Sequence, residues 1–211
     1  MNLTEMRDRL RKDLHDEDTQ NQRWTDAELD RHIQRAVGDL SLSVPLEAKT
    51  TLSTTADSRD LSIAGLTDLV AIEAVEHPVG NYPPAYVPFS VWLSTLTMLI
   101  DSPPGAAEDV SVYHTKLHTL DATTSTLPAR LEDVVATGSA AYAALEWASF
   151  ATNRVNVGGQ DVWRDYLTWG QQRLAEFQRA LARHSRRNAV RIRRLYRPAT
   201  TPVDQSTVTG P

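Results

Sequence analysis

The stretch Trp24-Thr25-Asp26-Ala27-Glu28-Leu29 contains the clearest helix start in the chain. Thr25 is a suitable N-cap, and Glu28, three residues later, completes a capping box in which each side chain binds the other residue's backbone N–H. Trp24 and Leu29 occupy the two positions of a hydrophobic staple. Apolar residues at helical spacing follow at Ile33, Ala36, Val37 and Leu40. Because proline cannot continue a helix, we predict an amphipathic helix that begins after Thr25 and stops before Pro45.

The segment before this start predicts another helix, over about residues 3–15. Apolar residues recur there three and four positions apart, at Leu3, Met6, Leu10 and Leu14. Asn2 and Glu5 have the spacing of a second capping box. The two N-terminal helices are therefore expected to pack through apolar stripes.

Four acidic side chains lie at the end of the first helix and in the turn that follows it, at Asp13, Asp16, Glu17 and Asp18. Carboxylates gathered in this way can hold a cation or act as an acid–base pair. The cluster contains no glycine that would allow a tight calcium-binding loop. We therefore expect a solvated turn.

The period of the apolar residues changes after about residue 49, where short Thr-rich and β-branched segments begin. Residues 49–55 and 59–63 predict a hairpin, and residues 69–76 predict a strand. Residues 91–100 and 110–117 flank the turn Ser102–Gly105 and predict a second hairpin. The proline-rich segment 78–88 should be irregular. Together these segments predict a small antiparallel β insert over about 49–118.

Apolar residues return to helical spacing after Leu127-Pro128. Pro128 is suited to begin this helix, because proline is favoured at the first helical position. Residues 128–151 predict a central helix, in which alanines and Gly138 permit close approach of neighbouring helices. Residues 161–187 predict the last helix, after a turn that contains Gly158-Gly159. Trp163 and Trp169 in this helix are six residues apart, so they do not share one face, and we expect them to serve packing.

These elements define the expected fold class, which is α+β and mainly α. Two N-terminal and two C-terminal helices form a four-helix core, and the small antiparallel β insert interrupts it between residues 49 and 118. A single domain is expected over 1–189, followed by an extended basic C-terminal arm and tail at 190–211. The tail is rich in Pro, Thr and Gly, so we expect it to be mobile in isolation.

The charges are distributed unevenly along the chain. The 22 basic and 27 acidic side chains give a net charge of −5, yet residues 173–197 hold nine arginines and one acid. The arm's candidate binding residues are Arg186, Arg187, Arg191, Ile192, Arg193, Arg194, Tyr196 and Arg197. Such a cluster can dock on a protein, bind nucleic acid, or complement the C-terminal dipole of a helix, and the residues alone leave these three readings open.

Signatures of catalysis and of cofactor binding are absent from the sequence. The chain has no cysteine, no phosphate-binding glycine loop and no Gly-x-Ser-x-Gly elbow. His114 and His118 are the only close histidine pair, and on the predicted strand they would lie roughly 13 Å apart, too far to share an ion. We expect solvated histidines, no metal, no cofactor and no enzyme activity. Neither a membrane span nor a signal peptide is expected.

The order of these elements resembles the head–tail connector (adaptor, or head-completion) proteins of tailed bacteriophages. The resemblance is carried by the short first helix Leu3–Leu14, the acidic turn and the opening Trp24–Leu29. The β insert and the helices Leu131–Phe150 and Val162–Leu181 continue it, so that it covers about residues 1–190. The insert is larger than in the smallest, all-helical members of this family.

The resemblance implies a structural virion protein at the head–tail junction, assembled in the host cytoplasm. It implies a cyclic oligomer, commonly of twelve subunits, that docks on the portal protein and presents a surface to a tail or stopper protein. DNA would pass through this ring without specific binding. The family has no catalytic residues, and its docking element is a C-terminal segment, which corresponds here to Arg186–Arg197. A nucleic-acid-binding protein that uses this Arg cluster is the alternative.

Overall fold

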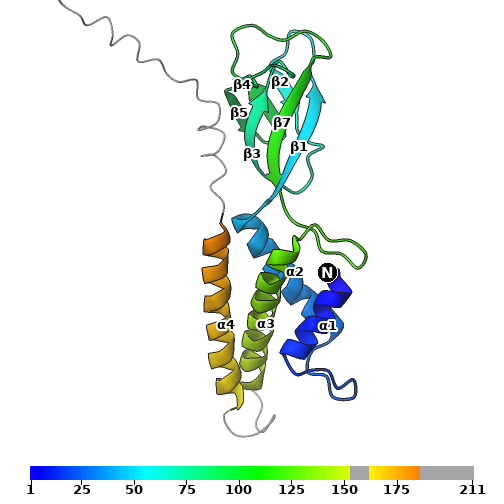
Figure 1. Cartoon of the computed structure of the whole chain (residues 1–211), viewed down its shortest axis with the longest axis vertical. Coiled ribbons are helices and arrows are strands. Elements are labelled where there is room, and N and C mark those ends of the chain that lie inside the picture. Colours follow the sequence, from blue (N-terminus) through cyan, green and yellow to red (C-terminus); the bar gives the residue numbers. More distant parts are fainter. Residues whose placement is uncertain (153–161, 186–211) are drawn as a thin grey trace, which may run out of the picture. The chain divides into compact units, whose positions relative to one another are not determined.

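The structure, a computed structural model, describes residues 1–152 and 162–185. It divides into two compact units. The helical unit comprises the described residues of Met1–Leu46 and Leu117–Arg186, and the β unit is Glu47–Lys116. Four helices and two small sheets are described (Figure 1). The predicted α+β class is therefore confirmed.

The first two helices begin at the predicted caps. In α1 (Leu3–Asp13), the Asn2 side chain accepts a 2.9 Å hydrogen bond from the Glu5 N–H, and the Glu5 carboxylate accepts one from the Asn2 N–H. In α2 (Asp26–Ser43), Thr25 and Glu28 form the same reciprocal pair. Both capping boxes are confirmed, because they depend on residues only three positions apart.

The acidic turn after α1 is only partly solvated. Glu17 and Asp18 are exposed as expected, but Asp16 is buried with the guanidinium of Arg11, 2.8 Å from one of its oxygens. Arg11 also donates to the Trp24 carbonyl at 3.1 Å and to Asp26 at 2.6 Å, and this contact holds the pKa of Asp26 below its usual range. The expectation of a solvated turn was wrong for Asp16, because Arg11 supplies the charge that lets a carboxylate be buried.

The remaining helices, α3 (Ala129–Thr152) and α4 (Val162–His184), lie within the predicted segments or extend them by one residue. Figure 1 shows α3 between α4 and α1. From Val134 to Ala148 almost every position of α3 is buried or half-buried, so the helix is apolar all round rather than amphipathic. One hydrophobic core includes buried residues of all four helices, with Phe177 of α4 among the largest.

Small residues set the distance between α3 and α4. A Cβ atom at Gly138 would lie 2.8–2.9 Å from three ring carbons of Phe177, and one at Gly170 would lie 3.0 Å from Leu145. A glycine at these positions therefore lets each helix approach the side chains of the other, as the sequence predicted for Gly138. The Phe177 ring also contacts Tyr142 edge-on, with the ring centroids 6.2 Å apart.

The β unit contains two sheets. One has the order β1 (Leu46–Ser53), β7 (Asp109–Lys116), β3 (Leu69–Glu76) and β4 (Tyr86–Val87), and the other has β2 (Asp60–Ser62), β6 (Thr95–Met98) and β5 (Phe89–Trp92). The β3–β7 and β5–β6 pairs are antiparallel. The buried residues of both sheets form a separate core: Leu61, Ile63, Val75, Leu96, Met98, Val110 and Val112.

Both predicted hairpins were wrong. β1 lies beside β7 whereas β2 pairs with β6, so the segments 49–55 and 59–63 belong to different sheets. Residues 91–100 fold on themselves instead, because the chain turns at Leu93 (φ 53°) and pairs Trp92 with Thr95. A leucine in the left-handed region is no turn signal in the sequence, so the turn could not be predicted.

The approach of α3 to α4 predicts opposite effects for two glycine substitutions. Gly138→Ala should lower the free energy of unfolding of the helical unit by about 1–3 kcal/mol, because the new methyl group overlaps the Phe177 ring. Gly38→Ala in α2 is the matched control: nothing lies within 4 Å of its added Cβ, and it should raise stability by about 0.5–1 kcal/mol. Denaturant titration followed by far-ultraviolet circular dichroism measures both. An increase in stability on Gly138→Ala would contradict the close packing of Gly138 against the Phe177 ring.

The buried ion pair predicts a similar contrast between two arginines. Arg11→Met should lower the free energy of unfolding by about 3–5 kcal/mol, because Asp16 would keep its buried charge without the guanidinium. Arg9→Met removes ion pairs to Asp13 and Asp133 that water reaches, and should cost less than about 1 kcal/mol. Thermal and denaturant unfolding compare the two variants. Equal losses of unfolding free energy in the two variants would show that the buried Arg11–Asp16 pair contributes no more than the exposed pairs of Arg9.

Candidate assembly surfaces

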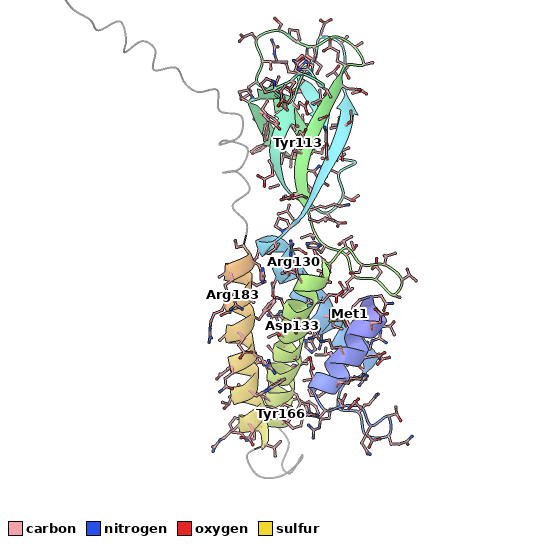
Figure 2. The ribbon with its side chains drawn as sticks, viewed as in Figure 1. Met1, Tyr113, Arg130, Asp133, Tyr166 and Arg183 are labelled. Carbon is pink, nitrogen blue, oxygen red and sulfur yellow. The ribbon has the colours of Figure 1, made fainter. Side chains whose placement is uncertain are left out.

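The predicted docking arm lies outside the described residues. All eight of its candidate residues fall between positions 186 and 197: Arg186, Arg187, Arg191, Ile192, Arg193, Arg194, Tyr196 and Arg197. The structure describes the chain up to the end of α4, where Arg179, Arg183 and His184 are exposed. Figure 2 shows Arg183 on the side of α4 that faces away from α3. Arg183 lies in the last turn, where its positive charge complements the negative end of the helix dipole.

The two histidines that lie close together in the sequence, His114 and His118, belong to the interior of the fold. β7 ends at Lys116, so His118 lies beyond the strand, and both His114 and His118 are buried rather than solvated. The two ring nitrogens of His118 face the backbone carbonyls of Thr126 and Val44, at 3.1 and 3.0 Å. The expectation of solvated histidines was therefore wrong. Within residues 1–152 and 162–185, no three His, Asp or Glu side chains are placed to hold a metal ion.

A cavity of about 440 Å³, lined by charged and apolar side chains, lies among α2, α3 and α4. In it Arg31 and His32 contact the Glu146 carboxylate, and burial lowers the pKa of His32. The Tyr142 hydroxyl donates to Asp39, and burial raises the pKa of Tyr142 to about 12. Tyr142, Arg31 and Glu146 are thus held in contacts within the helical unit, whereas the buried His32 Nε2 makes no hydrogen bond with the described residues.

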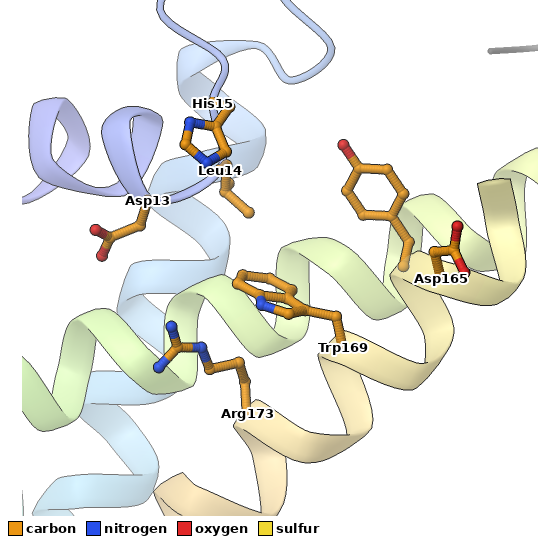
Figure 3. A pocket seen from close by; sticks show the side chains of 7 residues that line it. Asp13, Leu14, His15, Asp165, Trp169 and Arg173 are labelled. Carbon is orange, nitrogen blue, oxygen red and sulfur yellow. The ribbon is translucent and has the colours of Figure 1, made fainter.

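A second cavity, which we call the aromatic groove, opens between the end of α1 and the start of α4 (Figure 3). It has a volume of about 390 Å³ and is lined by Asp13, Leu14, His15, Asp165, Tyr166, Trp169 and Arg173. Figure 3 shows the Trp169 and Arg173 side chains extending from α4 toward the end of α1. Trp163 and Trp169 are half-buried against the helical core, in agreement with the expected packing role. The groove combines the apolar surface of Leu14, Tyr166 and Trp169 with two carboxylates and the Arg173 guanidinium.

Large apolar side chains are exposed on the β unit. Val91, Trp92 and Leu93 are consecutive, at the turn between β5 and β6, and we call them the apolar tip. They are 42%, 81% and 88% exposed. Tyr82, elsewhere in the same unit, is 99% exposed. Neither the groove nor the tip was found by sequence reasoning, because exposure and cavities depend on tertiary packing.

The charges of the β unit are mostly acidic. Residues 47–116 contain nine acidic and three basic side chains. Glu76 is the buried one, where the Tyr113 hydroxyl donates a 2.7 Å hydrogen bond to it and Lys49 lies 3.6 Å away. These contacts lower the pKa of Glu76, so it is ionised in the fold. With nine acidic and three basic side chains, the unit as a whole has a negative net charge.

No helix in the part of the chain that the structure describes has the length and apolarity of a membrane span.

None of the curated proteins compared with the chain matches it. Fifteen chains of solved structures match, and one of them comes from the "neck of empty GTA particle computed with C6 symmetry". That match has 13% identity and a TM-score of 0.31, and covers 80% of this chain and 88% of the other.

The comparison with protein families gives the decisive result. The sequence model of the family described as SU10 adaptor protein matches residues 1–202, which includes both units and the predicted docking arm. The suspected relationship to phage adaptor proteins is thereby confirmed. The chain belongs to the SU10 adaptor protein family.

Proposed function

We propose that this protein forms a ring that joins the phage portal to a tail or stopper protein and extends the DNA channel. The family match over residues 1–202 carries the proposal, because it supports a structural role in the phage neck. In each subunit, residues 1–189 would act as one connector domain, with a four-helix core and the β insert at about 49–118. The ring would consist of about twelve copies, in a virion assembled in the host cytoplasm.

The chemistry of the described residues agrees with a structural role. The polar groups of the helical unit are used in packing: Arg11 compensates Asp16, and His118 faces two backbone carbonyls. A connector needs stable subunits and exposed contact surfaces rather than a reactive site. The exposed apolar side chains of the β unit and the aromatic groove are such surfaces. We therefore assign no catalysis, metal or cofactor.

We further propose that the basic arm is the element that docks on the portal. Six arginines within twelve residues repel one another in the free subunit, and the interspersed Ile192 and Tyr196 require an apolar partner surface. An acidic groove with apolar pockets on the portal would satisfy both sets. Charged contacts at its rim would speed the encounter of the two proteins.

The negative net charge of residues 1–185 supports the proposal that DNA slides through a channel in the ring. Residues 1–185 contain 16 basic and 26 acidic side chains, a net charge of −10. Binding of duplex DNA requires neutralisation of phosphates by Lys and Arg, so a body with this charge should bind weakly. The alternative of a nucleic-acid-binding protein therefore depends on the arm alone. Tight binding of duplex by the protein without residues 186–211 would favour that alternative.

Deletion of residues 186–211 should leave the fold intact and abolish attachment to the portal. The removed segment lies beyond α4, so the melting temperature and the circular dichroism should stay close to those of the full chain. Co-sedimentation with the phage's portal protein measures attachment. Replacing Arg186, Arg187, Arg191, Arg193, Arg194 and Arg197 by Ser should weaken attachment and reduce its salt dependence.

Arg179→Ser with Arg183→Ser is the matched control for the arm. These two arginines are exposed on α4, so their loss removes positive charge near the arm without changing the arm itself. The control should attach to portals nearly as well as the wild type. Normal attachment of the truncated protein would show that the arm is not the docking element.

A further inference from the structure

The apolar tip is exposed in a way that the fold of the subunit does not require. Val91, Trp92 and Leu93 follow one another in the sequence, and most of the surface of Trp92 and Leu93 is open to water. Single exposed apolar residues are ordinary on protein surfaces, whereas two large ones that follow one another at a hairpin turn, as Trp92 and Leu93 do, indicate an interaction site. Tryptophan is also the residue type most enriched at the energetic centres of interfaces.

The backbone at the tip adds a second observation. Leu93 has φ 53°, in the left-handed region that glycine, asparagine or aspartate normally occupies in tight hairpins. A leucine there costs conformational energy and, at 88% exposure, gains little by burial. Strain of this kind persists at sites where a side chain must be presented in a particular direction.

The tip also belongs to a sheet edge that carries no charge. In the sheet β2-β6-β5, strand β5 lies at one edge and its residues Phe89–Trp92 include no charge. The opposite edge, β2, has only three residues and begins with Asp60. Short strands and charges are the usual protection against contact with other chains. The β5 edge carries no charge and its residues Ser90–Trp92 are exposed, so it is suited to contact another molecule.

The aromatic groove has the complementary chemistry. Leu14, Tyr166 and Trp169 offer apolar surface, and its volume of about 390 Å³ lies in the range of roughly 300–1,000 Å³ typical of binding pockets. The Asp13 and Asp165 carboxylates line the same groove and can accept a hydrogen bond from an indole N–H. A buried tryptophan needs such an acceptor.

We propose that the apolar tip of one copy inserts into the aromatic groove of the next copy in the ring. The inference rests on the ring proposed above and names the contact that would close it. A contact between two different patches of the same chain is heterologous, and repetition of such a contact produces a ring when the rotation closes. A two-fold contact of tip with tip would produce only dimers.

Engineered cysteines test this contact directly, because the chain has no cysteine of its own. Leu93→Cys and Asp165→Cys are introduced together into the full-length protein, which is then assembled with the phage's portal protein under mild oxidation. Disulfides between copies should produce a ladder of covalent oligomers, from dimers up to the closed ring, in non-reducing electrophoresis. Tyr82→Cys with Asp165→Cys is the matched control, since Tyr82 is even more exposed than Leu93 but lies outside the tip.

The two single-cysteine variants complete the controls. Cross-linking of Leu93→Cys alone to dimers would show a tip-to-tip contact and overturn the proposal. A ladder of equal intensity from the Tyr82 control would overturn it as well, since the cross-linking would then be unspecific. Assembly on the portal without a ladder would refute the tip–groove contact and leave the adaptor function standing. A wild-type protein that never assembles with portal would refute both.

Two substitutions at the tip give an independent readout. Trp92→Ser should raise the concentration needed for assembly by at least about tenfold, because it removes the central apolar anchor. Leu93→Gly should weaken assembly while raising the melting temperature, because glycine relieves the strain at φ 53°. If the turn served only the structure of the subunit, Leu93→Gly would not weaken assembly. Unchanged assembly of both variants would contradict the proposal.

Discussion

The burial of α3 on all sides is the constraint on which the helical unit depends. A helix with apolar and small residues around its whole circumference is stable only when neighbours cover it, and α1, α2 and α4 provide that cover. Gly138 and Gly170 then fix how closely α3 and α4 approach, because Phe177 and Leu145 occupy the space that a Cβ atom would need. The positions of the aromatic groove and of the end of α4 follow from this packing.

Polar groups in the interior stabilise this arrangement. Arg11 joins α1, the acidic turn and the start of α2 through Asp16, Trp24 and Asp26. Such a network favours one arrangement of the first two helices, because a buried charge without its partner is costly. The exposed apolar side chains and the aromatic groove are the surfaces available to other molecules, in agreement with the proposed adaptor role.

Local signals explain which parts of the fold could be predicted. Caps at Asn2 and Thr25 and the 3.6-residue period gave the helices, since both depend on neighbours in sequence. The prediction of strand pairing failed because β1 and β2 pair with strands about 60 and 35 residues away in the sequence. The burial of residues such as Leu61 and Leu96 determines these pairs. The burial of Asp16, the turn at Leu93 and the aromatic groove likewise arise from tertiary packing, so they gave no signal in the sequence. The basic arm was visible from charge alone, and it lies outside the described residues.

Electron cryomicroscopy of the portal vertex in purified virions tests the adaptor role most directly. The adaptor role predicts a closed ring of this chain in contact with the portal on one side and with a tail or stopper protein on the other. Density for the helical unit, with its buried α3, would identify the chain within the ring. Absence of the protein from the portal vertex, or its presence only as a two-fold dimer, would contradict the proposed function.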